Sequence, residues 1–301
     1  MKKDKATASV RRPGRRLLHH FRVGHGNRSL GGNLCMGLFL LLMAVFMVFP
    51  LVYTVCNAFK PLSELFLFPP RFFVRNPTLQ NFIDLGNLVS SSWVPFSRYL
   101  FNTVFIAAAG TAGHVFVSAH AAYALANNKF AGSRFIFKVI VLSLMFSSAV
   151  TAVPSYLILA DFGWIDSYAA VIVPAFSSSL GVYLLKQFME GVHPALLESA
   201  RMDGAGEFRV LWRIVMPIVR PAWLTLIILM VQNLWNSNSG YIFSEQLKTL
   251  TGALNQIVAG GIARAGTAGA ASLFMMIVPI TVFVVTQSNV IETMGTSGMK
   301  D

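Results

Sequence analysis

Two histidines, His114 and His120, are the first candidates for chemistry, because they lie within a long apolar stretch of the sequence. A titratable group inside a membrane-spanning segment would serve as a proton relay or an ion-coupling site. The two residues are six positions apart, so they do not share a helix face, and no acidic residue stands beside them in that stretch. We therefore expect neutral histidines packed between helices, with a proton relay as the alternative.

Other signatures of catalysis or cofactor binding are absent from the sequence. The G-x-x-x-x-G-K-[ST] pattern that cradles nucleotide phosphates does not occur, and no His, Cys, Asp and Glu cluster has metal-ligand spacing. Cys35 and Cys56 would lie roughly 32 Å apart along one helix, which is too far for a disulfide. The sequence thus predicts neither an enzyme nor a cofactor or metal bound by this chain.

A polar segment at about 190–221 has the pattern of two helices joined by a glycine corner. Pro194 suits the first turn of a helix, and Gly204 suits a helix stop, where φ is positive. A second helix then begins near Glu207 and carries an apolar face at i, i+3, i+4 and i+7 spacing: Phe208, Leu211, Trp212 and Val215. Pro217 ends or kinks that helix.

Small side chains gather around this corner: Ser199, Ala200, Gly204, Ala205 and Gly206. Small residues let another protein surface approach the backbone closely. The pattern therefore favours a docking surface, and the alternative is an amphipathic loop that lies on lipid headgroups.

The rest of the chain must position this segment, and its composition indicates a membrane protein. Hydrophobic residues make up 55% of the chain, charged residues make up 12%, and the mean hydropathy is +0.61, whereas soluble domains carry about 25% charged residues. Backbone groups in lipid must pair internally, which favours helices. Apolar runs long enough to cross the bilayer predict an all-α protein with six transmembrane helices, near 34–56, 99–125, 138–159, 168–188, 222–240 and 269–290.

The distribution of basic residues predicts the orientation of these helices. Nine of the 24 Lys and Arg residues lie in 1–33, directly before an apolar run, which indicates an orientation and headgroup signal rather than nucleic-acid binding. With the N-terminus in the cytoplasm, 18 basic residues fall inside and six outside. Both termini are therefore expected in the cytoplasm, and the 190–221 loop is expected there between helices four and five.

The predicted domains are a basic cytoplasmic leader, 1–33, and a single transmembrane domain, 34–301. The apolar run that starts at Leu34 is longer than the 7–15 residues of a signal-peptide core. We therefore expect it to remain as a membrane anchor.

At this point the sequence resembles a known family. The 190–221 loop is similar to the EAA loop of binding-protein-dependent ABC importer permeases, whose pattern is E-A-A, three residues, G, nine residues, then I-x-L-P. The matching positions are Glu198, Ser199, Ala200, Gly204, Ile214 and Pro217, with Asp203 before the glycine as in the sugar branch. Ser199 and Met216 depart mildly from the pattern. Further stretches from about residue 33 to the end, among them Asn102–Thr103, Pro154–Tyr156 and Trp235–Asn236, resemble carbohydrate permeases of the maltose-system type.

The resemblance implies a multi-pass subunit of the bacterial inner membrane that imports a carbohydrate. Its implied partners are a second, related permease, a dimer of ATPase subunits that bind ATP and Mg²⁺, an extracytoplasmic solute-binding protein and membrane lipid. The first helix of the 190–221 loop would dock in the ATPase through Glu198, Ala200, Asp203 and Gly204. Another polar solute as cargo, or an ion-coupled secondary transporter, is the alternative.

Polar and aromatic residues near the outer end of the fifth predicted helix are candidates for the substrate path. They are Asn233, Trp235, Asn236, Asn238 and Tyr241. Sugar sites combine aromatic faces with amide hydrogen bonds. The alternative is an interfacial aromatic belt at a polar helix end.

Overall fold

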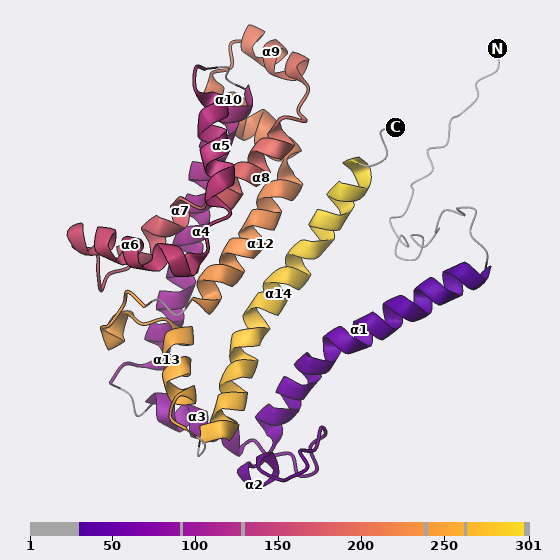
Figure 1. Ribbon diagram of the computed structural model, residues 1–301, viewed down its shortest axis with the longest axis vertical. Coiled ribbons are helices and arrows are strands. Elements are labelled where there is room, and N and C mark those ends of the chain that lie inside the picture. The colour runs from indigo at the N-terminus through magenta and orange to yellow at the C-terminus, as the bar shows by residue number, and fades with distance from the viewer. Residues whose placement is uncertain (1–29, 91–92, 128–129, 238–239, 262–263, 298–301) are drawn as a thin grey trace, which may run out of the picture. The chain divides into compact units, whose positions relative to one another are not determined.

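The computed structural model describes residues 30–90, 93–127, 130–237, 240–261 and 264–297. Every regular element within these ranges is a helix, as the apolar runs predicted (Figure 1). The first eight are α1 (Leu30–Phe59), α2 (Leu62–Leu65), α3 (Gln80–Ser90), α4 (Phe96–Asn127), α5 (Ser133–Ser143), α6 (Ser148–Asp161), α7 (Ala169–Phe176) and α8 (Ser179–Met189).

The remaining elements begin at the 190–221 loop. They are α9 (Pro194–Met202), α10 (Glu207–Val210), the π-helical turn η1 (Leu211–Val215), α11 (Met216–Ile218), α12 (Arg220–Asn236), the 3₁₀ turn η2 (Glu245–Leu247), α13 (Leu250–Val258) and α14 (Ala265–Ser297).

Contacts divide the chain into two units, 1–51 and 52–301. In the first unit, the described part of α1 exposes apolar side chains around its whole circumference, among them Leu34 and Phe46. A helix that is apolar all round is suited to a lipid environment. The basic leader predicted for 1–33 falls, up to residue 29, outside the described residues.

In the second unit, α4 is the central helix and packs against α7, α8 and α12. Glycines bring these helices into close contact. A Cβ atom added at Gly110 would lie 2.6 Å from Leu234 Cδ1 on α12, and one at Gly113 would lie 2.0 Å from Phe176 Cε1 on α7. Small residues at such positions let helix backbones approach closely, as is typical of membrane helix pairs.

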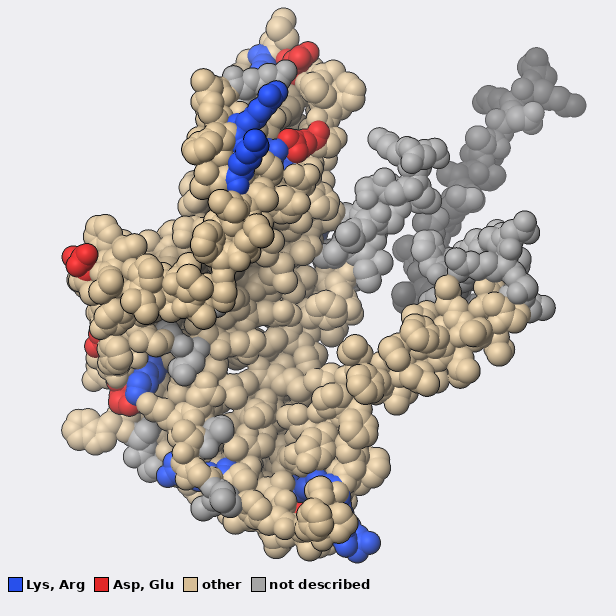
Figure 2. Space-filling model, in the orientation of Figure 1, with Lys and Arg blue, Asp and Glu red and all other residues tan. Residues whose placement is uncertain are grey.

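The helices suited to crossing a membrane differ in part from the predicted six. Within the described ranges, four stretches are long and apolar enough, namely Gly31–Phe59, Phe96–Asn127, Ala169–Met189 and Ala265–Gln287. The pair Glu207–Ile218 and Arg220–Asn236, bent by 84°, gives a fifth if it counts as one span. On the face shown in Figure 2, Lys and Arg side chains of the 52–301 unit lie near its top and in its lower part, and uncharged side chains cover most of the surface between them.

The third predicted span, 138–159, is not one continuous helix. It is divided between α5 and α6, which are separated by residues 144–147. The division has a local cause, because the Ser147 hydroxyl accepts the Ala149 N–H at 3.3 Å and caps the start of α6. Hydrophobicity alone did not reveal this cap, since the serine lies within an apolar run.

The segment after α12 is tied to α4 by two buried polar side chains. Asn102 Nδ2 donates to the carbonyl oxygens of Gln246 and Lys248, both at 2.9 Å. Thr103 Oγ1 accepts the Leu250 N–H at 2.7 Å, at the start of α13. Both Asn102 and Thr103 are fully buried, so these bonds fix the path of the segment at the end of the bundle.

Candidate functional site

The 190–221 loop has the local structure that its sequence predicts. The His193 side chain accepts the Ala195 N–H at 3.3 Å, and α9 begins at Pro194. Gly204 follows the helix with a φ of 79°, a conformation that costs glycine little. The corner is closed by hydrogen bonds of 3.0 Å, of which one runs from the Gly204 N–H to the Arg201 carbonyl.

The second half of the loop bends more sharply than the pattern predicts. After α10 the chain makes the π-helical turn η1, and the axis then turns by 84° before α12 begins at Arg220. Leu211 and Val215 are buried, as the apolar spacing predicted, whereas Phe208 is 64% exposed. Pro217 lies inside α11, next to the bend, so the predicted kink is found there.

Helix α9 has one buried face and one exposed face. Leu197 and Ala200 are buried against the core formed by α4, α8, α10, η1 and α12. Glu198 and Ser199 are exposed, and so are two apolar residues that the sequence analysis did not single out, Leu196 at 43% and Met202 at 88%. The exposed face of α9 therefore carries apolar as well as polar side chains.

The predicted coupling residues divide between these two faces. Asp203 and Gly204 are exposed beside Glu198, and Pro217 is also exposed. Ala200 points into the chain's own core, and Ile214 packs against the same core. The small size of Ala200 is therefore required by packing within the chain, and this residue is not part of the outer contact surface.

Glu207 joins three elements at the base of the loop. Its carboxylate accepts hydrogen bonds from Arg201 Nε at 2.8 Å and from Arg201 Nη2 at 3.2 Å, which link α10 to α9. The Tyr123 hydroxyl, at the end of α4, donates to Glu207 Oε2 at 2.5 Å. The carboxylate thus connects the loop directly to the central helix of the bundle.

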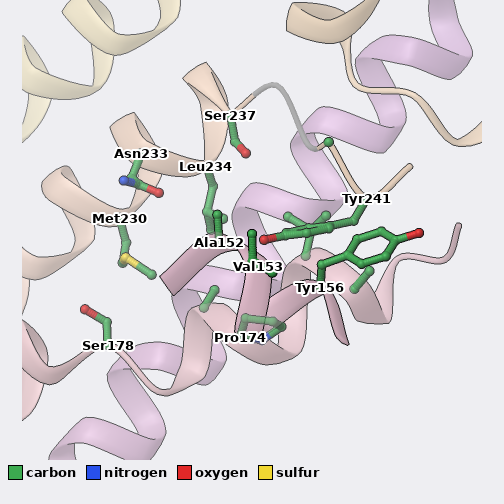
Figure 3. A pocket seen from close by; sticks show the side chains of 14 residues that line it. Ala152, Val153, Tyr156, Pro174, Ser178, Met230, Asn233, Leu234, Ser237 and Tyr241 are labelled. Atoms are coloured by element: carbon green, nitrogen blue, oxygen red, sulfur yellow. The ribbon is translucent and has the colours of Figure 1, made fainter. Parts of the chain in front are cut away.

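A second candidate site is a pocket of about 900 Å³ toward the other end of the bundle. Its walls come from α6, α7, α12 and the segment after α12 (Figure 3). The rings of Tyr156 and Tyr241 lie side by side, with centroids 6.4 Å apart. The polar lining is completed by Ser178, Asn233 and Ser237, and among the described lining residues none carries a charge.

Asp166 holds the rim of this pocket, and it has a φ of 59°. Its N–H donates to the Tyr241 carbonyl at 2.8 Å, while Oδ1 accepts the N–H groups of Phe243 and Ser244 at 2.9 and 2.8 Å. The Ser244 hydroxyl donates to Oδ2. These bonds, led by that of the Ser244 hydroxyl, lower the pKa of the Asp166 carboxyl, so the rim is held by an ionised group at neutral pH.

The predicted path residues are only partly brought together. Asn233 and Tyr241 line the pocket. Trp235 does not, because its ring is 3% exposed and its Nε1–H donates to the Met275 carbonyl at 3.2 Å. Asn236 is exposed elsewhere on α12, and Asn238 lies outside the described residues.

Most of the lining residues were not assigned to the path from the sequence, among them Tyr156, Ser178, Met230 and Ser237. The spacing of Met230, Asn233 and Ser237 places them on one face of α12. This spacing could have predicted from the sequence that Met230 and Ser237 share a face with Asn233. The position of Tyr156, which reaches the pocket from α6, depends on tertiary structure.

The two histidines have different surroundings. His114 is 1% exposed in the contact between α4 and α8. His120 Nδ1 lies 2.8 Å from the Phe116 carbonyl oxygen, and its ring contacts those of Phe116, Phe208 and Trp212. Among the described residues, no group of three or more His, Cys, Asp and Glu could hold a metal ion. Both histidines thus lie among packed side chains.

These features define a helical membrane component with an exposed amphipathic helix at one end and a neutral pocket toward the other. Residues 28–292 match the family described as "Binding-protein-dependent transport system inner membrane component". The chain belongs to this family, as the EAA-loop resemblance indicated.

Curated relatives include permease proteins of several transport systems. The chain is 29% identical over 205 residues to the arabinooligosaccharides transport system permease protein AraQ of Bacillus subtilis, covering 68% of this chain and 72% of the relative. It is 27% identical over 210 residues to the sn-glycerol-3-phosphate transport system permease protein UgpE of Brucella suis, covering 67% and 74%.

The fold is also found in a solved structure. A chain of a bacterial ABC transporter involved in the import of the acidic polysaccharide alginate superimposes with a TM-score of 0.71 at 20% sequence identity. The match covers 85% of this chain and 95% of that one. The fold of that chain is therefore shared across most of this one.

Proposed function

We propose that this chain is the transmembrane permease subunit of an ATP-driven carbohydrate importer, and that its cargo is an oligosaccharide. Partner ATPase subunits bind ATP and Mg²⁺, and their hydrolysis cycle drives alternating access in the permease. This chain performs no covalent chemistry. The observation that carries the proposal is the exposure of Glu198 on α9 and of Asp203 and Gly204 directly after it, with the apolar side chains of Leu196 and Met202 exposed on the same helix.

The proposed topology has six spans in one permease domain, 34–301, in the bacterial inner membrane. The third span is formed by α5 and α6 in succession, and both termini lie in the cytoplasm. The excess of Lys and Arg on the segments placed inside, 18 of 24, supports this orientation. The 190–221 loop then faces the cytoplasm, and the pocket lies toward the outer side.

The proposed partners follow from this orientation. The exposed face of α9 docks in a cleft of one ATPase subunit, while Ile214 and Pro217 hold the following helix in place and Ala200 packs in the core of this chain. A second permease completes the translocation path, and an extracytoplasmic binding protein delivers the cargo. A chain of similar fold belongs to a bacterial alginate ABC transporter solved in complex with a periplasmic protein, which supports a partner of that kind.

Two alternatives are weaker. Another polar solute as cargo is favoured by the name of the relative UgpE, a glycerol-3-phosphate permease, but the described pocket lining has no cation to pair with a phosphate. An ion-coupled secondary transporter would require ionisable groups in the path. His114 is buried in a helix contact instead, outside the pocket lining.

Co-purification tests the assembly. The tagged chain, extracted from its native membrane in mild detergent, is expected to bring with it a second permease and an ATPase, as its membership of the binding-protein-dependent transport family suggests. Mass spectrometry of the purified complex identifies the subunits. Recovery of the chain alone, or only with copies of itself, would contradict the importer assignment.

We infer that the pocket is this chain's part of the sugar path. Hydroxyl and amide groups at Ser178, Asn233 and Ser237 offer both donors and acceptors to a polyhydroxylated cargo. The adjacent faces of Tyr156 and Tyr241 offer apolar area with polar tips. The absence of charge among the described lining residues suits a neutral saccharide.

Asn233→Leu is expected to lower uptake about tenfold, because it replaces the amide by an apolar group of similar size and removes a hydrogen-bonding partner of the cargo. The measurement is uptake of labelled arabinotriose by proteoliposomes that contain the whole complex. Asn236→Leu is the matched control, since Asn236 lies on the same helix but does not line the pocket. Equal losses in both variants would contradict the assignment.

A further inference from the structure

Besides its apolar packing, the 190–221 loop is linked to the bundle by hydrogen bonds to one carboxylate. Glu207 accepts two hydrogen bonds from Arg201 on α9 and one from Tyr123 on α4. The ion pair on its own is worth little, because the side chains of Arg201 and Glu207 are 38% and 55% exposed. The Tyr123 side chain differs, since the residue is only 5% exposed, and its hydroxyl makes a short bond to a charged acceptor.

Helix α4 can transmit a displacement from this contact to other parts of the bundle. It is one continuous helix of 32 residues, and Tyr123 and Gly110, 13 residues apart, are separated by about 20 Å along it. Close packing at Gly110 and Gly113 locks the helix to its neighbours α7 and α12. A displacement at Tyr123 therefore moves a rigid, tightly packed element.

The far end of this path is the pocket. A Cβ atom at Gly110 would touch Leu234 Cδ1 at 2.6 Å and Ala175 Cβ at 3.6 Å, and both of these residues line the pocket. The two contacts lie on different helices that line the pocket, Leu234 on α12 and Ala175 on α7. A shift of α4 thus acts on both of these helices at once.

We propose that the Arg201–Glu207–Tyr123 cluster is the joint through which movement of α9 is passed to α4 and so to the pocket. This rests on the proposed function, because it assumes that an ATPase moves α9. The three residues are positioning residues, since none lines the pocket. Tyr123 and Glu207 are the essential pair, and Arg201 holds the Glu207 carboxylate in place.

The test uses the whole complex and two separate readouts. The first is the amount of ATPase that co-purifies and its rate of ATP hydrolysis. The second is the distance between spin labels at Val153 and Asn236, both exposed, with Cys35 and Cys56 replaced by serine. The change in this distance on trapping with ATP and vanadate reports the response of the pocket, and it requires no knowledge of the cargo.

Tyr123→Phe and Glu207→Gln are each expected to leave ATPase recovery and the rate of ATP hydrolysis within about twofold of wild type. The population of complexes with the shifted spin-label distance is expected to fall about tenfold, because each variant loses a charge-assisted hydrogen bond. The double variant should lose no more than either single one, because the two residues form one interaction. Tyr183→Phe removes a tyrosine hydroxyl from the neighbouring helix α8 and should respond as wild type.

The outcomes separate the two proposals. A wild-type complex without ATPase, or without any distance change on trapping, contradicts the proposed function itself. A normal wild-type response that persists in Tyr123→Phe contradicts the joint alone. A parallel loss of ATPase recovery, hydrolysis and distance change in both variants also overturns it, because the cluster would then only stabilise the fold of the loop.

Discussion

Gly204→Asp is expected to reduce uptake at least about a hundredfold while the chain remains in the membrane. A Cβ atom at Gly204 would meet no other atom of the chain within 4 Å, and aspartate is among the few residues that tolerate a positive φ such as the 79° found here. The variant therefore introduces no steric clash within the subunit, and its strain is confined to the positive φ of one residue. Its damage comes from a carboxylate placed in a desolvated contact with the ATPase, which costs several kcal/mol when the charge is unpaired.

Two comparison variants separate this effect from backbone strain. Gly132→Asp introduces the same side chain at another open position with positive φ, 93°, before α5, and should transport normally. Gly204→Asn keeps the size of the side chain without its charge and should lose less activity. Uptake and membrane content are measured for all three in the same strain. Normal uptake by Gly204→Asp would show that the glycine corner contacts no partner.

The 190–221 loop could be predicted closely because its determinants are local. Proline at the start of a helix and glycine at a positive φ act through the backbone of a few neighbouring residues, so α9 and its corner were found at the expected positions. The roles of individual α9 residues could not be predicted as closely from the sequence. Ala200 belongs to the buried face and Met202 to the exposed one, a distinction that depends on which side of the helix meets α4 and α8.

The π-helical turn η1 and the 84° bend could not be predicted in the same way. An apolar face at helical spacing is compatible with a straight helix that continues to Pro217. The bend is formed where the chain leaves the loop and enters α12, and a proline near the site indicates a kink without fixing its angle. The division of the 138–159 run into α5 and α6 was not predicted for a related reason. Hydropathy shows how long an apolar run is, but not where a side chain caps a helix within it.

The sequence of a single helix predicts only part of the pocket lining. Asn233 and Tyr241 were identified because amides and aromatics cluster near the end of one span. Trp235 belongs to the same cluster but points to the opposite side, where it packs with α13 and α14 residues. A face assignment from the 100° spacing of α12 separates Trp235 from Asn233, whereas Tyr156 comes from α6 and requires the tertiary fold.

Gly181→Ala is expected to destabilise the bundle by about 1–3 kcal/mol, because it forces extra volume into the contact between α4 and α8. The added Cβ atom would lie 2.4 Å from His114 Nε2 and 2.5 Å from Ser118 Oγ. Both side chains are buried, at 1% and 0% exposure, so neither can move into solvent. Thermal unfolding of the purified subunit in detergent measures the effect as a lowered transition temperature.

Gly86→Ala is the matched control, since it makes the same change within helix α3, where the added Cβ meets nothing within 4 Å. Alanine is favoured over glycine in a helix by about 1 kcal/mol, so this variant should unfold at the same temperature as wild type or slightly above it. The same helix preference acts at Gly181, and the expected loss there is therefore a net result in which the clash outweighs the gain. An unchanged or raised transition temperature for Gly181→Ala would mean that His114 has room to rotate away, and that the contact between α4 and α8 is looser than the distances indicate.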